Sequence, residues 1–165
     1  MAMEEKQLLL KDLCARLPYG VKYCRYSWNY EWDQEMPVVE ILEDIDKDGY
    51  INYRKVYKVE DIKPYLRPME SMTEEDLISY ANYDFANDDT YKIVDYRCPP
   101  GRGFINLYCS SIRHPEERPV IFQRTRTSPL ENWRGIDWLN EHHFDYRNLI
   151  KMGLAIKAPD GMYNF

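Results

Sequence analysis

The sequence predicts an α+β protein, in which helices and antiparallel strands occupy separate stretches of the chain. Two observations lead to this class. Segments of alternating apolar and polar residues, rich in β-branched and aromatic side chains, follow one another without a helix of about 12 residues between them, which favours antiparallel pairing. Stretches with apolar residues at helical spacing stand before, between and after these strands.

The first element is a helix over residues 3–17. Leucines recur through it at helical spacing, and Glu4 and Glu5 near its start complement the helix dipole. Pro18 prevents the helix from continuing. Three alternating strands are expected next, over residues 21–28, 38–45 and 50–59. The polar turn DKDG between the last two predicts a hairpin over 38–59.

Residues 60–72 contain two prolines and are expected to be extended. Thr73 then precedes three acidic residues and predicts the N-cap of a short helix from 74 to about 83. Strands at 91–97, 104–112 and 119–125 follow as a meander. Helical spacing returns over 129–152, with a second short helix expected at 145–152, capped by Asp145 and ended by Gly153.

These elements predict one α+β domain over residues 1–165, with a division into subdomains 1–72 and 73–165 left open. The first subdomain would hold the N-terminal helix and a small antiparallel sheet, and the second the meander and the C-terminal helices. The apolar positions of these elements predict a core of Leu13, Val39, Ile41, Ile51, Val56, Ile93, Ile105, Ile121, Trp138, Leu139 and Leu149.

Three phrases of the sequence carry a resemblance: LPYGVKY at 17–23, IKPYLRPMESMTEED at 62–76 and WLNEHHFDYRNLIKMGLAIKAPDGMY at 138–163. Together they resemble a family of uncharacterised proteins from Bacteroidetes gut anaerobes and their mobile elements. The resemblance implies an intracellular bacterial or phage-borne protein. It implies no catalytic or binding residue, because that family has no assigned activity.

Two patterns that suggest metal binding fail on inspection. Residues 44–55 fit the EF-hand calcium loop until its last position, where Lys55 stands in place of the bidentate glutamate. The adjacent His142 and His143 would point about 100° apart on a helix, so the two rings cannot face one ion. We therefore expect no metal ion and, with seven glycines and no phosphate-binding loop, no cofactor.

The sequence favours a protein that is not an enzyme, since it lacks the common nucleophile motifs. Cys98 is the exception, because Arg97 and Arg102 near it would lower the pKa of its thiol. An enzyme that uses Cys98 as a nucleophile is therefore one alternative, although no general base stands nearby in the sequence.

A second alternative follows from the charges. Residues 91–134 hold eight basic and four acidic residues, while the whole chain has a net charge of −6. Seven of the eight basic residues are arginines that alternate with aromatic residues, a composition suited to nucleic acids or other anions. Candidate contacts are Arg97, Arg102, Arg124 and Arg126. The rival interpretation is that these arginines pair with acidic residues of the chain itself.

The leading prediction is a small interaction module that binds another protein. The chain carries 15 tyrosines and 4 tryptophans, and aromatic and acidic residues alternate in YSWNYEWDQE at 26–35 and in YANYDFANDD at 80–89. Such segments suit a basic protein surface, or imitate nucleic acid towards a protein that binds it. Trp28 and Trp32 are the candidate contacts. The acidic N-terminus resembles neither a signal peptide nor a membrane span, so a cytoplasmic protein without membrane contact is expected.

Overall fold

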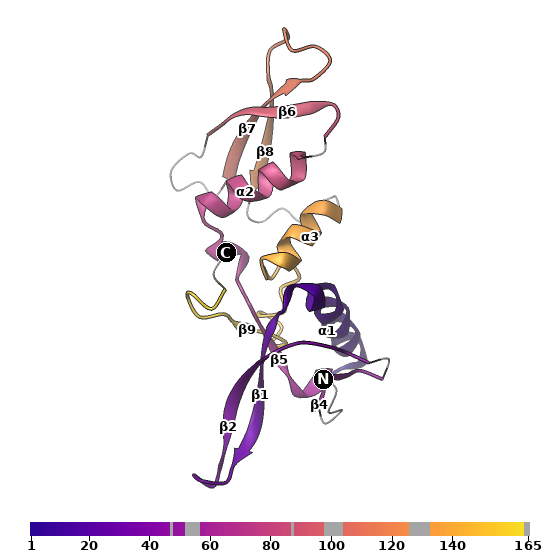
Figure 1. Ribbon diagram of the computed structural model, residues 1–165, viewed down its shortest axis with the longest axis vertical. Helices are drawn as coiled ribbons and strands as arrows, with labels where there is room; N and C mark the ends of the chain where they lie inside the picture. Colours follow the sequence, from indigo (N-terminus) through magenta and orange to yellow (C-terminus); the bar gives the residue numbers. More distant parts are fainter. Residues whose placement is uncertain (47, 52–56, 87, 98–103, 126–132, 164–165) are drawn as a thin grey trace. The chain divides into compact units, whose positions relative to one another are not determined.

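The computed structural model, which describes residues 1–46, 48–51, 57–86, 88–97, 104–125 and 133–163, confirms the α+β class (Figure 1). The chain divides into two units: unit 1 is Met1–Pro68 with Leu139–Phe165, and unit 2 is Met69–Trp138. The bounds of these units differ from the division into 1–72 and 73–165 that the sequence left open. The C-terminal segment returns to unit 1, because the amide of Arg67 donates to the carbonyl of His143 at 2.8 Å and a short strand there extends the unit 1 sheet.

Unit 1 begins with the predicted helix, α1 (Met3–Arg16). The Glu5 carboxylate accepts a hydrogen bond from the amide of Ala2 at 2.7 Å, which satisfies one of the amides left free at the helix N-terminus. A single 3₁₀ turn (Leu17–Tyr19) follows, and Gly20 then takes a left-handed φ of 65° that lets the chain reverse into the sheet.

The unit 1 sheet has the strand order β2-β1-β5-β9. Its strands are β1 (Lys22–Asn29), β2 (Gln34–Ile41), β5 (Lys63–Leu66) and β9 (Ile156–Lys157). Both β2 and β5 pair antiparallel with β1, whereas β9 runs parallel to β5. The proline-containing segment that the sequence predicted as extended thus supplies an inner strand of the sheet.

The predicted hairpin over 38–59 is wrong, because β2 pairs along its whole length with β1. Residues 50–59 instead contribute two short strands, β3 (Tyr50–Ile51) and β4 (Tyr57–Lys58), which pair with each other. Of the predicted pairing, the described part of 38–59 retains one antiparallel bridge, between Ile45 and Ile51. A short 3₁₀ turn (Val59–Asp61) leads from β4 to β5.

The DKDG turn is built on an aspartate side chain. The Asp46 carboxylate accepts hydrogen bonds from the amides of Asp48 and Tyr50 at 2.9 and 3.0 Å, and Gly49 takes a φ of 80°. One oxygen of the supposed calcium loop is therefore engaged by its own backbone. Among the residues that the structure describes, no group of three His, Cys, Asp or Glu side chains is placed to hold a metal ion.

The core of unit 1 lies between α1 and one face of the sheet. Its fully buried members come from both sides: Leu9, Leu13, Val21, Tyr23, Leu42, Val59, Leu66 and Leu149. Five residues of the predicted core are buried in unit 1 or unit 2: Leu13, Ile51, Trp138, Leu139 and Leu149. Ile93 is half-buried, while Val56 and the side chain of Ile105 lie outside the described residues.

Three predicted core residues are exposed: Val39, Ile41 and Ile121, at 48%, 51% and 57%. Side chains alternate between the two faces of these strands as predicted. The face that was predicted to be buried is the exposed one. In β2 the other face carries Glu40, whose carboxylate is held at the sheet by Tyr23 and Arg25. In the meander it is Phe122, the neighbour of Ile121, that lies on the side packed against the helix of its unit.

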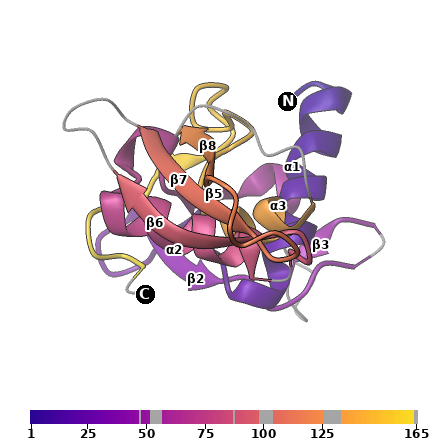
Figure 2. The same ribbon diagram turned by 90° about the horizontal axis from the view of Figure 1, so that it is seen from above.

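Unit 2 consists of a helix packed on the predicted meander (Figure 2). A 3₁₀ turn (Met69–Ser71) precedes α2 (Glu74–Phe85), and the N-cap is Thr73 as predicted, its hydroxyl accepting from the amide of Asp76 at 3.1 Å. The strands are β6 (Tyr91–Arg97), β7 (Phe104–Ser111) and β8 (Val120–Thr125), in that order. Phe85 of α2 packs on Phe122 with ring centres 5.6 Å apart.

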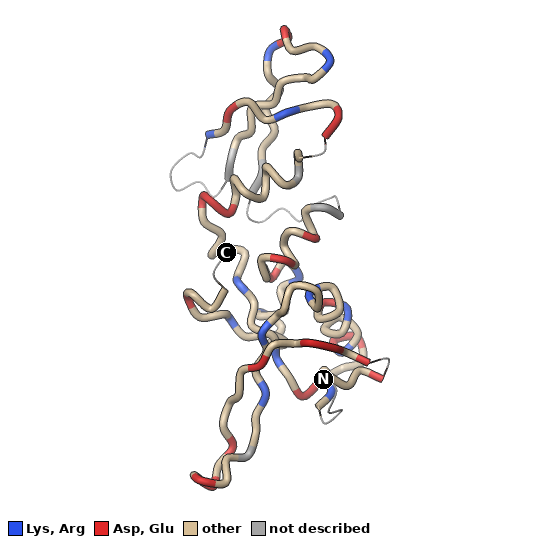
Figure 3. The backbone as a smooth tube through the Cα atoms, viewed as in Figure 1, with Lys and Arg blue, Asp and Glu red and all other residues tan. Residues whose placement is uncertain are grey.

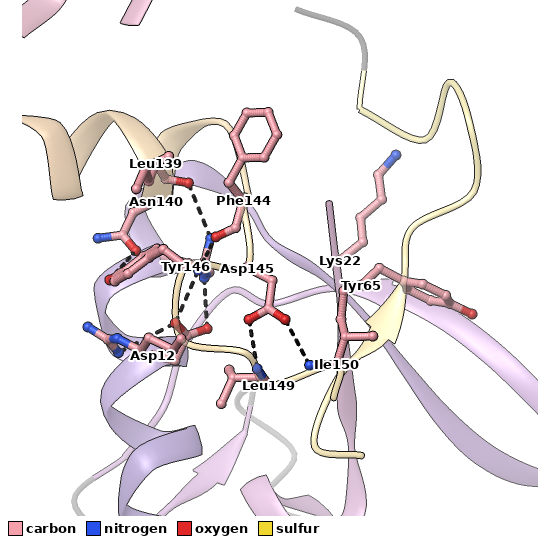
Figure 4. A network of polar contacts seen from close by, with 12 residues as sticks. Asp12, Lys22, Tyr65, Leu139, Asn140, Phe144, Asp145, Tyr146, Leu149 and Ile150 are labelled. Atoms are coloured by element: carbon pink, nitrogen blue, oxygen red, sulfur yellow. Dashed lines mark hydrogen bonds and ion pairs between the residues drawn. The ribbon is translucent and has the colours of Figure 1, made fainter. Parts of the chain in front are cut away.

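Over the described residues 133–163 the chain forms one helix, α3 (Trp133–Glu141), and unit 2 ends within it at Trp138. The predicted second helix at 145–152 is wrong, because Asn148 takes a left-handed φ of 60° that a helix does not permit. The predicted capping role of Asp145 is nevertheless present: its carboxylate accepts from the amides of Leu149 and Ile150 at 2.8 and 2.9 Å (Figure 4). No helix within the described residues combines the length and apolar character needed to cross a membrane.

Candidate protein-binding surface

The hairpin of β1 and β2 extends beyond the rest of the unit 1 sheet. Its eight residue pairs run from Lys22 opposite Ile41 to Asn29 opposite Gln34, whereas β5 pairs only with Tyr23 and Cys24 at the base of β1. The distal part is therefore a two-stranded ribbon, which Figure 1 shows projecting from the remainder of unit 1. Such a ribbon presents both of its faces to a partner.

An asparagine side chain orders the end of this ribbon, which we call the hairpin tip (residues 29–35). The Asn29 side-chain oxygen accepts hydrogen bonds from the amides of Glu31 and Trp32 at 2.9 and 3.2 Å. It thus takes the place that a backbone carbonyl has in an ordinary turn. Asp33 completes the reversal with a φ of 51°, a conformation that aspartate tolerates better than most residues. The tip is therefore a defined turn that fixes where its side chains project.

Large aromatic side chains of the ribbon face solvent. Tyr30 is 90% exposed, Tyr26 63% and Trp32 60%. Three carboxylates alternate with them at Glu31, Asp33 and Glu35, and residues 26–39 contain no lysine or arginine (Figure 3). Aromatic residues are enriched at protein interfaces, and several together on a surface mark an interaction site more than single exposed ones do. The tip is thus an acidic, aromatic projection.

The base of the hairpin is held by a polar cluster that keeps the ribbon in place. The Arg25 guanidinium donates to the Glu40 carboxylate at 2.6 and 3.1 Å and lies 4.7 Å from the centre of the Tyr57 ring. The Tyr23 hydroxyl donates to the same carboxylate at 2.6 Å. The hydrogen bond with Glu40 raises the pKa of Arg25 above its ordinary value. The contacts join both strands to the 57–58 segment.

Of the two predicted protein-binding residues, Trp32 lies on the hairpin tip and is exposed. Trp28 is in β1 opposite Glu35, next to the tip, while its side chain lies outside the described residues. The two predicted residues therefore lie on the hairpin tip or next to it. The sequence did not single out Tyr30, whose exposure depends on the turn that Asn29 forms.

The four predicted arginines are only partly described. Arg97 ends β6, where its guanidinium lies 5.1 Å from the centre of the Tyr108 ring and 3.8 Å from the Asp95 carboxylate, with 70% of the side chain exposed. Arg124 is in β8 opposite Ile105, and its side chain is outside the described residues, as are Arg102 and Arg126. Cys98 is outside them as well. The cysteine alternative therefore stays a prediction.

A buried ionic cluster, which the sequence pattern did not single out, ties α1 to the C-terminal segment (Figure 4). The Arg16 guanidinium binds the Asp12 carboxylate at 2.7 and 3.1 Å, and both side chains are fully buried. It also donates to the carbonyls of Leu139 and Phe144, at 3.4 and 2.8 Å. Asp12 and Arg16 are four residues apart on one face of α1, so the pair itself can be read from the sequence. Its burial cannot.

The C-terminal tail is bound to the sheet by Tyr163. In the pairing of β1 with β5, Tyr23 lies opposite Pro64, which places Lys22 opposite Tyr65. At this next position the Tyr163 hydroxyl accepts from the amide of Lys22 at 3.0 Å and donates to the carbonyl of Tyr65 at 2.9 Å. A side chain thus extends the hydrogen bonds of the sheet. Burial raises the pKa of Tyr163 to about 12, so the hydroxyl keeps the proton that it donates.

The change Tyr163→Phe is expected to lower the free energy of unfolding by about 1–3 kcal/mol, because it leaves two backbone groups of the sheet without their partner. The ring is retained, and with it the contact with His143, whose ring centre lies 4.0 Å away. Urea denaturation followed by circular dichroism measures the change. Tyr96→Phe, at an exposed position of β6, is the control and should have no effect. Equal stability of the two variants would contradict the bridging role.

Compared with known proteins, the chain matches no protein-family model, no curated protein and no solved structure.

Proposed function

We propose that this protein is a non-enzymatic interaction module that binds the basic surface of another protein through its hairpin tip. The observation that carries the proposal is the exposure of Tyr30 and Trp32, at 90% and 60%, between carboxylates on an ordered turn. A preordered turn loses little conformational entropy on binding, and aromatic side chains supply most of the binding energy of many interfaces. The carboxylates add attraction to a positively charged partner and exclude acidic ones.

The cysteines fit an intracellular setting for this module. Cys14, Cys24 and Cys109 are free thiols in the part of the chain that the structure describes. Free thiols persist in reducing compartments, which supports a cytoplasmic location as part of the proposal.

Nucleic-acid binding through residues 91–134 is the second candidate, favoured by one observation. Arg97 presents an exposed guanidinium stacked near Tyr108, an arrangement that suits a phosphate beside a base. Asp95 shares that guanidinium, however, and the chain as a whole is negatively charged. We therefore expect no binding to random single- or double-stranded nucleic acid at physiological salt.

Selection from a random-peptide library tests the leading function and requires no identified partner. Peptides selected on the intact protein are expected to be rich in lysine and arginine. The double change Tyr30→Ala, Trp32→Ala should weaken their binding by about 30-fold, the loss typical of interface hot spots. Fluorescence anisotropy with labelled peptides measures this loss.

The matched control is Tyr96→Ala, which removes an aromatic side chain of unit 2 that is 47% exposed. It should leave peptide affinity unchanged. Peptides without excess positive charge, or affinities equally insensitive to the tip and control changes, would contradict the proposed function. A shift of labelled RNA that is lost with Arg97→Ala would favour the second candidate instead.

A further inference from the structure

One face of the unit 1 sheet, opposite the core, carries apolar side chains that the chain leaves uncovered. Directly paired residues of antiparallel strands lie on the same face, so Val39 shares a face with Cys24, and Ile41 shares it with Lys22. Two residues along β1, Tyr26 belongs to that face too. Tyr26, Val39 and Ile41 are 63%, 48% and 51% exposed. We call these three residues, together with the buried Cys24 beside them, the outer face.

A cavity opens beside the outer face. It is lined by Cys24 and Tyr26 of β1, by residues 60–63 and by Ile156 of β9, and its volume is about 190 Å³. Sites for small molecules and cofactors commonly occupy ~300–1,000 Å³, so this cavity is too small for such a ligand. It has room for one long side chain of a partner.

The composition of the cavity selects an apolar side chain. Its apolar lining includes Cys24 and Ile62, which are 5% and 2% exposed. Two carboxylates stand in the lining as well, but Glu60 is paired with Lys6 at 2.8 Å and Lys63 lines the same cavity. A cation inserted here would meet little net negative charge. An apolar side chain gains more binding free energy here than a cation would, because its insertion removes apolar surface of both partners from water.

The acidic charge lies at the other end of the same hairpin. Glu31, Asp33 and Glu35 surround the tip, with no basic residue between positions 26 and 39. From Cys24 to Asn29 the strand advances five residues, about 17 Å at the usual rise per residue. An extended peptide needs about five or six residues to cover that distance.

We infer that the partner bound by the hairpin tip contributes an extended basic segment, with an apolar residue anchored in the cavity at Cys24 and lysines or arginines about five or six residues away at the tip. This inference rests on the proposed function and adds the second half of the binding surface. On the same face, Tyr26 and its partner Pro37 lie between Cys24 and the tip and form the track along which the segment lies. The spacing between the anchor and the basic cluster is the property by which the partner is recognised.

Two synthetic peptides of about ten residues test the spacing. The first carries leucine followed, after five small polar residues, by three arginines. The second has the same composition with leucine placed among the arginines. Titration of each labelled peptide with the intact protein, followed by anisotropy, is expected to show about tenfold tighter binding of the first, because only that peptide reaches cavity and tip together.

A substitution on the outer face tests the track. The change Tyr26→Thr puts a β-branched side chain at a strand position that is 63% exposed, so the fold should persist, and it should abolish the advantage of the first peptide. The control is the same substitution on the unit 2 sheet, Tyr96→Thr, at a position that is 47% exposed. The control should leave both peptide affinities unchanged.

Three outcomes separate this inference from the proposed function. Tighter binding of the spaced peptide that is lost with the outer-face change and kept in the control supports both. Equal binding of the two peptides, weakened by Trp32→Ala, overturns the inference and leaves the tip as the binding site. Absence of binding by either peptide overturns the proposed function and the inference together.

Discussion

Replacing Asp12 by alanine is expected to lower the free energy of unfolding by about 3–5 kcal/mol, the loss found when one partner of a buried ion pair is removed. Arg16 would remain in the interior with the carbonyls of Leu139 and Phe144 as acceptors, without the carboxylate that binds it in the wild type. Arg147 would lose its counter-charge too, because its guanidinium lies 3.4 Å from Asp12. Guanidinium chloride denaturation followed by far-UV circular dichroism measures the loss.

Two further variants show whether this loss comes from the unpaired buried charge. Lys11→Ala, on the exposed side of the same helix, should change stability by no more than about 0.5 kcal/mol. The double change Asp12→Leu, Arg16→Met should be less destabilising than Asp12→Ala alone, since it leaves no buried charge at the pair. If Asp12→Ala costs no more than the lysine control, the ionic cluster does not hold α1 to the C-terminal segment.

Acid is expected to destabilise the protein through His143. Burial, with a smaller contribution from the positive charge of Arg16, lowers the pKa of this imidazole from its ordinary value of 6.5 to about 3. The ring is 2% exposed and stacks on Tyr163. The folded protein therefore keeps His143 neutral, while the unfolded chain takes up a proton as the pH falls below 6.5.

The direction of this pH dependence follows from the number of protons that each state binds. Because the unfolded state binds the additional proton, its free energy falls relative to the folded state as the pH decreases from 6.5 towards 3. The slope is about 1.4 kcal/mol per pH unit, so His143 should remove about 2 kcal/mol of stability between pH 8 and pH 5. Desolvation raises the pKa of Asp145, so that carboxyl acts in the opposite direction and the difference between variants is the quantity to measure.

Urea denaturation at several pH values compares the wild type with His143→Asn. Asparagine tolerates the φ of 57° at this position and has no proton to gain, so the stability of this variant should depend less on pH by about 2 kcal/mol over that range. His114→Asn, an exposed histidine of the β7–β8 connection, should leave the wild-type profile unchanged. Parallel pH profiles for all three proteins would show that His143 does not cause the acid sensitivity.

The hairpin tip shows how much of the proposed binding site could be predicted without coordinates. The alternation of aromatic and acidic residues over 26–35 pointed to this segment, because that composition favours an interface in any fold. The cavity beside Cys24 could not be located in this way. It combines residues of β1, the 60–63 segment and β9, whose proximity depends on the order of strands in the sheet.

The sequence by itself determined the elements whose signals are local. The leucine spacing of α1, the Thr73 cap of α2 and the three strands of the meander all depend on residues within one turn or one strand. In each case the side chains that select the conformation are neighbours in the chain.

Only the tertiary structure decided which strands pair and which faces are buried. β2 joins β1, so the hairpin predicted at 38–59 does not form, and Val39 faces solvent while Glu40 is held by Arg25. The C-terminal segment returns to unit 1, where Arg16 meets carbonyls more than 120 positions away in the chain, at 139 and 144. Pairing and burial are set by the surface that distant segments remove from water together, and no local pattern contains that information.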